Sequence, residues 1–135
     1  MRQHGGVGAE GADAVAMLAG WAADGDVVVL SGAGLSTESG IPDYRGPSGA
    51  ARPSTPMTYQ SFTRDPAARR RDWARSHVGW RTIGDARPNA GHAAVAGLQR
   101  LGVLRGIITQ NVDGLHQAAG ARDVVELHGN LAPAA

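Results

Sequence analysis

The sequence contains no cysteine and no lysine among its 135 residues. Without cysteine the chain has no disulfide, no thiol nucleophile and no thiolate ligand for zinc. Without lysine it has no Schiff-base nucleophile, no lysine general base and no lysine of a Walker-type phosphate loop. These absences exclude several classes of enzyme, so any chemistry must depend on histidine, carboxylate, amide and hydroxyl groups and on a bound cofactor.

Aromatic residues, net charge and long apolar runs are also scarce. Aromatic residues make up 4% of the chain while glycine alone numbers 20, so the predicted core is thin, because small side chains bury little apolar area. A formal net charge of +1 indicates neither a nucleic acid nor an anionic membrane as partner. No apolar run is long enough to predict a secretory signal or a transmembrane helix, which leads us to expect a soluble cytoplasmic protein.

Helical and strand-like apolar patterns alternate along the chain. Apolar spacing predicts helices over about 14–23, 65–81, 89–101 and 113–118, of which the second is rich in arginine and amphipathic. Short β-branched runs predict strands over 26–30, 104–109 and 124–127, the first of them buried on both faces. The order predicts an α/β fold with an open sheet of parallel strands. We expect residues 1–9 to be flexible and residues 39–58 to form a long loop, a place to look for a lid.

Polar segments follow the three predicted strands, at residues 31–45, 109–116 and 128–130. In open α/β sheets ligands bind beyond the carboxyl ends of the strands, so these segments are expected to form one site. The glycine-rich segment 32–37 suits a pyrophosphate at a helix N-terminus, but Thr37 stands where the dinucleotide fingerprint has a third glycine. The alternative is a bare turn between strand and helix.

Each of the remaining candidate side chains also has two interpretations. Asn111 and Asp113 offer an amide and a carboxylate to ribose hydroxyls, or else form an Asx-turn and a helix N-cap. His128 is suited to be a general base, or is a hydrogen-bonded residue at a strand end. His92 is expected to be a packed structural residue. No third and fourth ligand accompany His116 and His128, so no metal site is predicted.

Taken together, four ordered motifs resemble the sirtuin family of NAD-dependent protein-lysine deacylases, with features similar to its class II branch. The first motif is Gly-Ala-Gly-Leu-Ser-Thr-Glu-Ser-Gly-Ile-Pro-Asp-Tyr-Arg at 32–45, and the second is Pro-Asn-Ala-Gly-His at 88–92. The others are Thr-Gln-Asn-Val-Asp-Gly-Leu-His at 109–116 and Glu-Leu-His-Gly at 126–129. The resemblance spans about a hundred residues and implies a Rossmann-like domain over 10–135.

The resemblance also implies roles for individual residues. NAD would be bound by Gly32, Ala33, Gly34, Thr37, Ile41, Asp43, Tyr44, Arg45, Gln110, Asn111, Asp113 and His128. The catalytic residues would be His128, Asn111 and Asp113, with His128 as the base. In the family's mechanism the acyl-lysine oxygen attacks the ribose carbon, nicotinamide leaves, and a deprotonated ribose hydroxyl then takes the acyl group. The implied partners are acyl-lysine proteins, with no nucleic acid and no membrane.

The sequence departs from the family after the fourth motif. The family continues into a zinc module with four cysteines and into later strands that contact adenosine, and neither is present in this sequence. We therefore expect an incomplete sirtuin domain that does not turn over alone. Two alternatives stay open, a protein mono-ADP-ribosyltransferase and a non-catalytic NAD-binding fragment with an unpaired sheet edge.

Overall fold

The computed structural model describes residues 9–43, 46 and 57–131. Its helices are α1 (Ala9–Ala23), the 3₁₀ helix η1 (Ala33–Ser39), α3 (Tyr59–Arg64), α4 (Pro66–Asp85), α5 (Ala90–Arg100) and α6 (Leu115–Ala118). Its strands are β1 (Val27–Ser31), β2 (Leu104–Thr109) and β3 (Val124–Glu126). All seven predicted elements occur in the predicted order, and η1 and α3 are two further helices that the apolar pattern did not predict. Most of the predicted loop over 39–58, including the place of the expected lid, lies outside the described residues.

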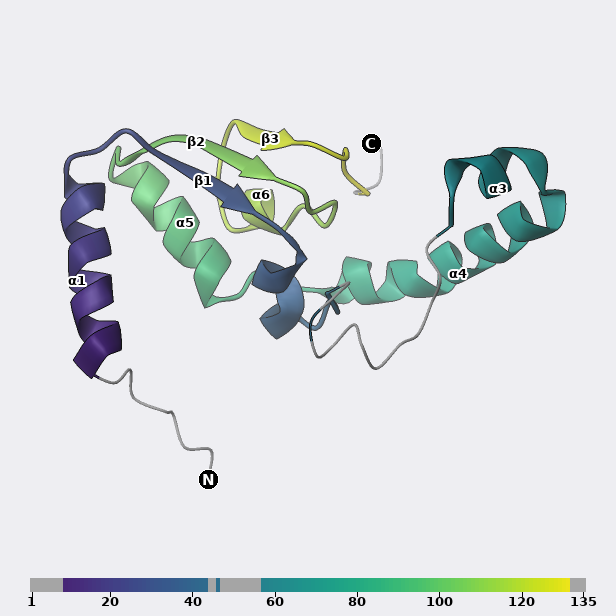
Figure 1. Ribbon diagram of the computed structural model, residues 1–135, viewed down its shortest axis with the longest axis horizontal. Helices are drawn as coiled ribbons and strands as arrows, with labels where there is room; N and C mark the ends of the chain where they lie inside the picture. The colour runs from purple at the N-terminus through teal and green to yellow at the C-terminus, as the bar shows by residue number, and fades with distance from the viewer. Residues whose placement is uncertain (1–8, 44–45, 47–56, 132–135) are drawn as a thin grey trace, which may run out of the picture.

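The three strands form one parallel sheet in the order β1-β2-β3 (Figure 1). Ser31 pairs with Thr109, and Thr109 pairs with Glu126, so the three strands end at the same level. At its other end β1 contains an irregularity, because Val27 pairs with Leu104 while the next residue, Val28, pairs with Gly106. The α/β fold with an open parallel sheet is therefore confirmed.

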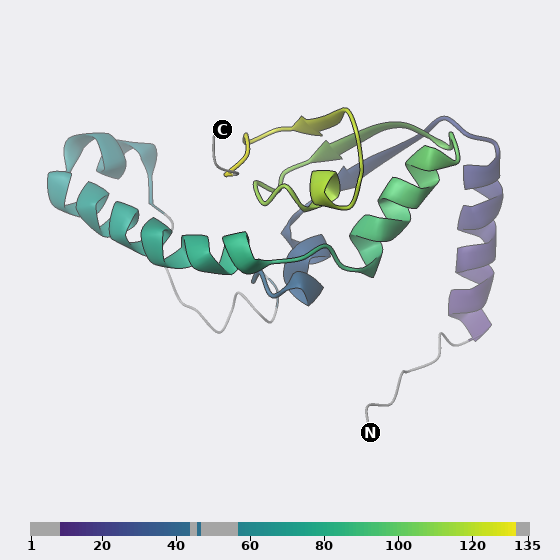
Figure 2. The same cartoon turned by 180° about the vertical axis from the view of Figure 1, so that it is seen from behind.

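The core lies on the face of the sheet that α5 and α6 cover (Figure 2). Ala96 of α5, Ile107 of β2 and Ala121 form its fully buried cluster. Two of these three side chains are alanines, which bury little apolar area, and the prediction of a thin core is confirmed. Asn89 caps α5, since its Oδ1 accepts from the backbone N–H groups of Gly91 and His92.

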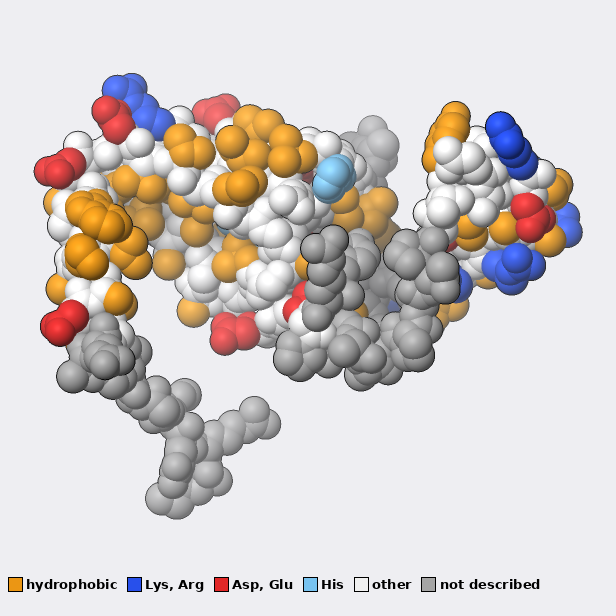
Figure 3. All heavy atoms as spheres, viewed as in Figure 1, with side chains coloured by type: hydrophobic (Ala, Val, Ile, Leu, Met, Phe, Trp, Pro, Cys, Tyr) orange, Lys and Arg blue, Asp and Glu red, His pale blue; other side chains and the backbone are white. Residues whose placement is uncertain are grey.

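The opposite face of the sheet corrects one prediction. Residues 26–30 were expected to form a strand buried on both faces, yet Val28 and Leu30 of β1 are more than half exposed. Val125 and Leu127 are also exposed, and Figure 3 shows hydrophobic side chains gathered over the sheet. An apolar run without polar alternation is typical of a strand covered on both faces, but in the described residues only one face of β1 is covered. Which faces are covered depends on helices elsewhere in the chain.

Two helical parts extend from the two ends of the sheet (Figure 1). The first is α1, which begins at Ala9, so the expected flexible segment 1–9 falls almost entirely outside the described residues. The second consists of α3 and α4, with Asp65 as N-cap and Pro66 in the first turn of α4. Helix α4 was predicted over 65–81 and ends four residues later. Its only fully buried residue is Ala68, so the expected amphipathic burial is not found along most of its length.

Within the described ranges, no helix is both long enough and apolar enough to cross a membrane.

Candidate functional site

A cavity of about 360 Å³ lies at the carboxyl ends of the strands. It is lined by Ala33, Ser36, Ile41, Ile83, Gln110, Asn111, Val112, Asp113 and His128. Six of these are among the residues singled out from the sequence, namely Ala33, Ile41, Gln110, Asn111, Asp113 and His128. Cavities that bind small molecules measure about 300–1,000 Å³, so this one has room for part of a nucleotide.

The turn between β1 and η1 forms one side of the site. Gly32 precedes η1 in an extended conformation, and no side chain caps the helix. A Cβ atom built on Gly32 or Gly34 would meet no other atom within 4 Å, so folding of the chain itself does not require glycine there. The open space over both backbones instead suits the close approach of a ligand. The Thr37 hydroxyl bonds within the turn, since its Oγ1 donates to the Gly34 carbonyl oxygen at 2.9 Å.

Asn111 is held in place by hydrogen bonds from both of its nitrogens. Its side-chain Nδ2 donates to the Gly32 carbonyl oxygen and to Ser36 Oγ, both at 3.1 Å. Its backbone N–H donates to Thr109 Oγ1 at 3.1 Å. Because Nδ2 is occupied, the amide oxygen Oδ1 is the side-chain atom left to accept a hydrogen bond from a ligand.

Asp113 forms the Asx-turn that was one of its two interpretations, but it also faces the cavity. Its Oδ1 accepts from the Leu115 backbone N–H at 2.9 Å, and its Oδ2 accepts from Ser36 Oγ at 2.7 Å. The N-cap residue of α6 is Gly114 rather than Asp113. Carboxylate oxygens have about four acceptor sites, so two bonds leave capacity for a ligand hydroxyl.

Ser36 joins these two residues, and the sequence analysis did not select it. It has no exposed surface, accepts from Asn111 and donates to Asp113. His92 Nε2 lies 3.5 Å from the same Oγ. One signal was available. Ser36 is a polar residue inside the glycine-rich turn, and in a parallel sheet the segment after β1 lies beside the polar segment after β2.

His92 is a buried structural residue, as predicted. It completes the capping box of α5, in which its Nδ1 accepts from the Asn89 backbone N–H at 3.3 Å. Burial lowers the pKa of His92 below its ordinary value of 6.5, and the charge of Asp113 partly opposes this shift. The imidazole is therefore neutral at pH 7, so its contact with Ser36 is between uncharged groups.

His128 follows the end of β3 and lines the same cavity as the glycine-rich turn after β1. Unlike His92 it is exposed, so it is accessible to a ligand. Gly129, with φ of 76°, lets the chain turn directly after it. Its sequence position beyond a strand end thus corresponds to a place at the site.

Other residues selected from the sequence lie around or outside the cavity. Gly32, Gly34 and Thr37 belong to the neighbouring turn, and Asp43 is half-buried but does not line the cavity. Tyr44 and Arg45 lie outside the described residues. Besides Ser36, two cavity residues, Ile83 and Val112, were not selected, because apolar residues give no signal of chemistry in a single sequence.

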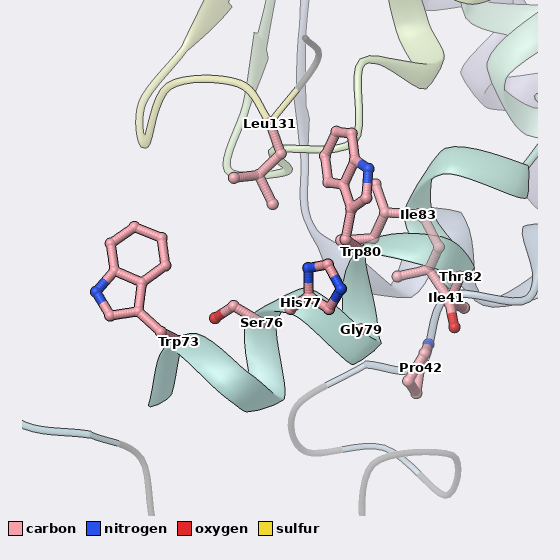
Figure 4. A pocket seen from close by; sticks show the side chains of 10 residues that line it. All are labelled: Ile41, Pro42, Trp73, Ser76, His77, Gly79, Trp80, Thr82, Ile83 and Leu131. Carbon is pink, nitrogen blue, oxygen red and sulfur yellow. The ribbon is translucent and has the colours of Figure 1, made fainter. Parts of the chain in front are cut away.

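A second cavity, of about 550 Å³, adjoins the first through Ile41 and Ile83. Figure 4 shows Trp73 and Trp80 of α4, Pro42 and Leu131 around it, with His77 and Ser76 as polar neighbours. It is therefore largely apolar, in contrast to the hydrogen-bonded cavity next to it.

Among the described residues, no group of three or more histidine, cysteine, aspartate or glutamate side chains is placed to hold a metal ion. The two histidines considered together in the sequence analysis differ in their surroundings. His116 is buried and bonded to Ser31, whereas His128 is exposed at the cavity.

The model of the Sir2 family matches residues 32–135, which include every side chain of the cavity. The chain belongs to the Sir2 family. It is 71% identical over 107 residues to NAD-dependent protein deacetylase 1 of Streptomyces coelicolor, an alignment that covers 79% of this chain and 36% of that protein. It is 56% identical over 124 residues to NAD-dependent protein deacetylase 1 of Mycobacterium avium, covering 92% of this chain and 42% of that protein. The chain thus spans less than half the length of these Sir2 relatives.

Solved Sir2 structures have the same fold. One, from work on the mechanism and regulation of Sir2 enzymes, aligns with a TM-score of 0.73 at 40% identity, covering 88% of this chain and 47% of that chain. Another, a Sir2 complex with a p53 peptide and NAD⁺, aligns with a TM-score of 0.73 at 35% identity, covering 85% of this chain and 45% of that chain. The sequence resemblance to the sirtuin family is confirmed.

Proposed function

We propose that this chain binds NAD at the strand-end cavity and supplies the nicotinamide-ribose side and the general base of an NAD-dependent protein-lysine deacylase. The observation that carries the proposal is that one cavity brings together Asn111, Asp113 and His128 beside the open Gly32–Gly34 backbone. The named Sir2 relatives are NAD-dependent protein deacetylases, which supports the same assignment.

The polar groups of the cavity suit a ribose ring. Asn111 Oδ1 is an acceptor fixed in direction, because both hydrogen-bond partners of Nδ2 belong to rigid parts of the fold. The oxygens of Asp113 are acceptors with a negative charge. Two neighbouring acceptors match two neighbouring hydroxyl donors, as on a ribose.

Asp113 also matches the charge change of the reaction. When NAD is bound, it supplies a cationic nicotinamide as the leaving group on the ribose carbon. A carboxylate held in place by the Leu115 N–H and the Ser36 hydroxyl favours positive charge at that carbon without having to reorient.

His128 is placed to take a proton. A ring nitrogen of a neutral imidazole can accept a proton, which is what the activation of a ribose hydroxyl requires. The side chain is exposed, lines the cavity and lies two residues after the end of β3. We assign to His128 the transfer of this proton, from the ribose hydroxyl to a ring nitrogen.

The adjoining apolar cavity suits the acyl group of an acyl-lysine. Trp80, Ile83 and Leu131 offer apolar surface next to the polar cavity. An acyl chain placed there would have its carbonyl oxygen near the shared wall formed by Ile41 and Ile83. In this arrangement the acyl chain would lie in the apolar cavity and the ribose of NAD in the polar one.

Calorimetric titration of the full chain with NAD tests the proposal. We expect binding that is weakened at least tenfold in Asn111→Ala, because the ribose loses its directed acceptor. Met17→Ala, on the exposed surface of α1, is the matched control and should bind as the unchanged chain does. Equal affinity of Asn111→Ala and the unchanged chain would contradict the proposed site.

Nicotinamide release in the presence of an acyl-lysine peptide tests the base. Where the unchanged protein turns over, His128→Ala should lose about 10²–10⁴-fold in rate, as is typical for removal of a general base. Its NAD affinity should change little, since Asn111 and Asp113 remain. Equal turnover would show that another group takes the proton, and product analysis would distinguish acyl transfer from ADP-ribosylation of a protein.

A further inference from the structure

His116 of α6 lies behind the cavity and has no role in the function proposed above. Only 1% of its surface is exposed, and its ring contacts that of His92 edge-on with 5.2 Å between the ring centroids. Its Nε2 lies 2.8 Å from Ser31 Oγ at the end of β1. Its Nδ1 is buried and has no hydrogen-bond partner within the described part of the chain.

A line of hydrogen bonds connects His116 to the backbone of Asn111. Ser31 Oγ donates to Thr109 Oγ1 at 2.8 Å, and the same Thr109 oxygen accepts from the Asn111 N–H at 3.1 Å. Thr109 and His116 are both nearly fully buried, so water does not compete for these bonds. The line is separate from Ser36, which holds the Asn111 side chain from the other direction.

One arrangement of the hydrogens along this line leaves no N–H of the His116 ring without an acceptor. A serine hydroxyl has a single hydrogen, and Ser31 gives it to Thr109. The bond between His116 and Ser31 must then be donated by the imidazole, so its hydrogen is on Nε2. The bare Nδ1 is an unpaired acceptor, whereas the other tautomer would bury an unpaired N–H donor and take the Ser31 hydrogen away from Thr109.

The same surroundings keep His116 neutral. Burial lowers the pKa of His116, the neighbouring His92 lowers it further, and Asp113 partly opposes both effects. A charged ring would also need a partner for Nδ1–H, and none is present among the described residues.

We propose that His116 is a positioning residue for Asn111, which it holds through Ser31 and Thr109 as a neutral imidazole protonated on Nε2. By fixing the ends of β1 and β2 to each other, it fixes the peptide from which the Asn111 amide projects. The amide direction matters for binding because Asn111 Oδ1 is the acceptor assigned to the ribose, and in this respect the inference rests on the proposed function.

Two substitutions separate positioning from packing. His116→Gln keeps an N–H donor at about the place of Nε2, while His116→Leu fills the space without a donor. We expect the dissociation constant for NAD to rise about tenfold in His116→Leu, as for the loss of one buried hydrogen bond, and less than about twofold in His116→Gln. Thr109→Val removes the next bond of the line and should give the same loss as His116→Leu, with no further loss when both are combined.

Nuclear magnetic resonance of the full chain provides readouts that need no nucleotide. Nitrogen–proton correlations of the histidine rings should show His116 protonated on Nε2 alone at pH 7. The Asn111 backbone amide should shift and exchange faster with solvent in His116→Leu, and return toward its original position in His116→Gln. Leu115→Ala, a buried neighbour on α6 that is outside the line, controls for stability: it should lower the melting temperature without moving the Asn111 amide.

The outcomes are distinguishable. If the unchanged chain does not bind NAD but the tautomer and the Asn111 amide behave as expected, the proposed function fails and the positioning role holds. If His116 is protonated on Nδ1, or if His116→Leu leaves the Asn111 amide unchanged, the positioning role is wrong whatever NAD does. Should His116→Leu fail to fold, Ser31→Ala gives the same decision, because it breaks the connection between His116 and Thr109 and leaves the bond from Asn111 to Thr109 in place.

Discussion

The two faces of the sheet differ in what covers them, although the same three strands supply both. On one face Ile107 has no exposed surface and packs with Ala96 and Ala121. On the other face Leu30 keeps 65% of its surface exposed. Between the two, at the carboxyl ends of the strands, polar side chains are buried and paired. The stability of this fold therefore depends on one covered face and on the hydrogen bonds at the strand ends.

The largest effect is expected on the covered face. Ile107→Ala should cost about 2–5 kcal/mol of unfolding free energy, because it removes the largest side chain of a small core and leaves a cavity. For a domain of marginal stability this is enough to abolish a cooperative thermal transition. Circular dichroism during heating measures it, and a transition unchanged from that of the unaltered chain would show that the core is elsewhere.

A smaller effect is expected at the strand ends. Ser36→Ala leaves Asn111 Nδ2 and Asp113 Oδ2 each without one buried partner, at a cost of about 1–3 kcal/mol in stability. Ser61→Ala, an exposed serine of α3, should stay within about 0.5 kcal/mol. Denaturant unfolding compares the two variants. Equal stabilities would mean that the buried hydroxyl contributes no more than an exposed one.

The buried histidines predict a dependence on pH. Burial lowers the folded-state pKa of His92 and His116 below the ordinary 6.5, so the unfolded chain binds more protons as the pH falls through about 6.5. Stability should therefore be full above pH 7 and decrease between about pH 6.5 and 5.

Melting temperatures measured from pH 8 to pH 5 test this dependence. His116→Gln should make the decrease shallower, while His77→Gln, at an exposed position on α4, should leave it as it is. A melting temperature that does not change between pH 7 and pH 5 would refute the prediction.

The smallest effect on stability is expected on the open face. Leu30→Thr should change the unfolding free energy by no more than about 0.5 kcal/mol, because the side chain is mostly exposed and threonine suits a strand. It should reduce self-association, since it makes the apolar patch smaller. Sedimentation at several concentrations measures this, and a stability loss as large as that of Ile107→Ala would mean that the face is covered in solution.

Much of this architecture could be predicted from the sequence, because the signals are local. The β-branched run at 26–30 and the helical spacing over 89–101 are local patterns, and they placed β1 and α5 to within one residue. The parallel order then placed 109–116 and 128–130 at one end of the sheet. For this reason Asn111, Asp113 and His128 were selected before their geometry was known.

The parts that could not be predicted depend on distant contacts. The exposure of Leu30 depends on where helices lie, which the strand pattern does not contain. The bond between Ser31 and His116 joins residues 85 positions apart and depends on the register of two strands and on the placement of α6. Ser36 and His116 were therefore missed as members of the network, although both lie inside segments that had been selected.

The irregularity at the start of β1 has an effect at the far end of the same strand. If the pairing of Val27 with Leu104 continued without a break, Ser31 would pair with Ile108, whose side chain points to the opposite face of the sheet. The one-residue step at Val28 instead brings two hydroxyl groups level. The alignment of these two hydroxyls thus depends on an irregularity at the amino-terminal end of the strand, away from the cavity.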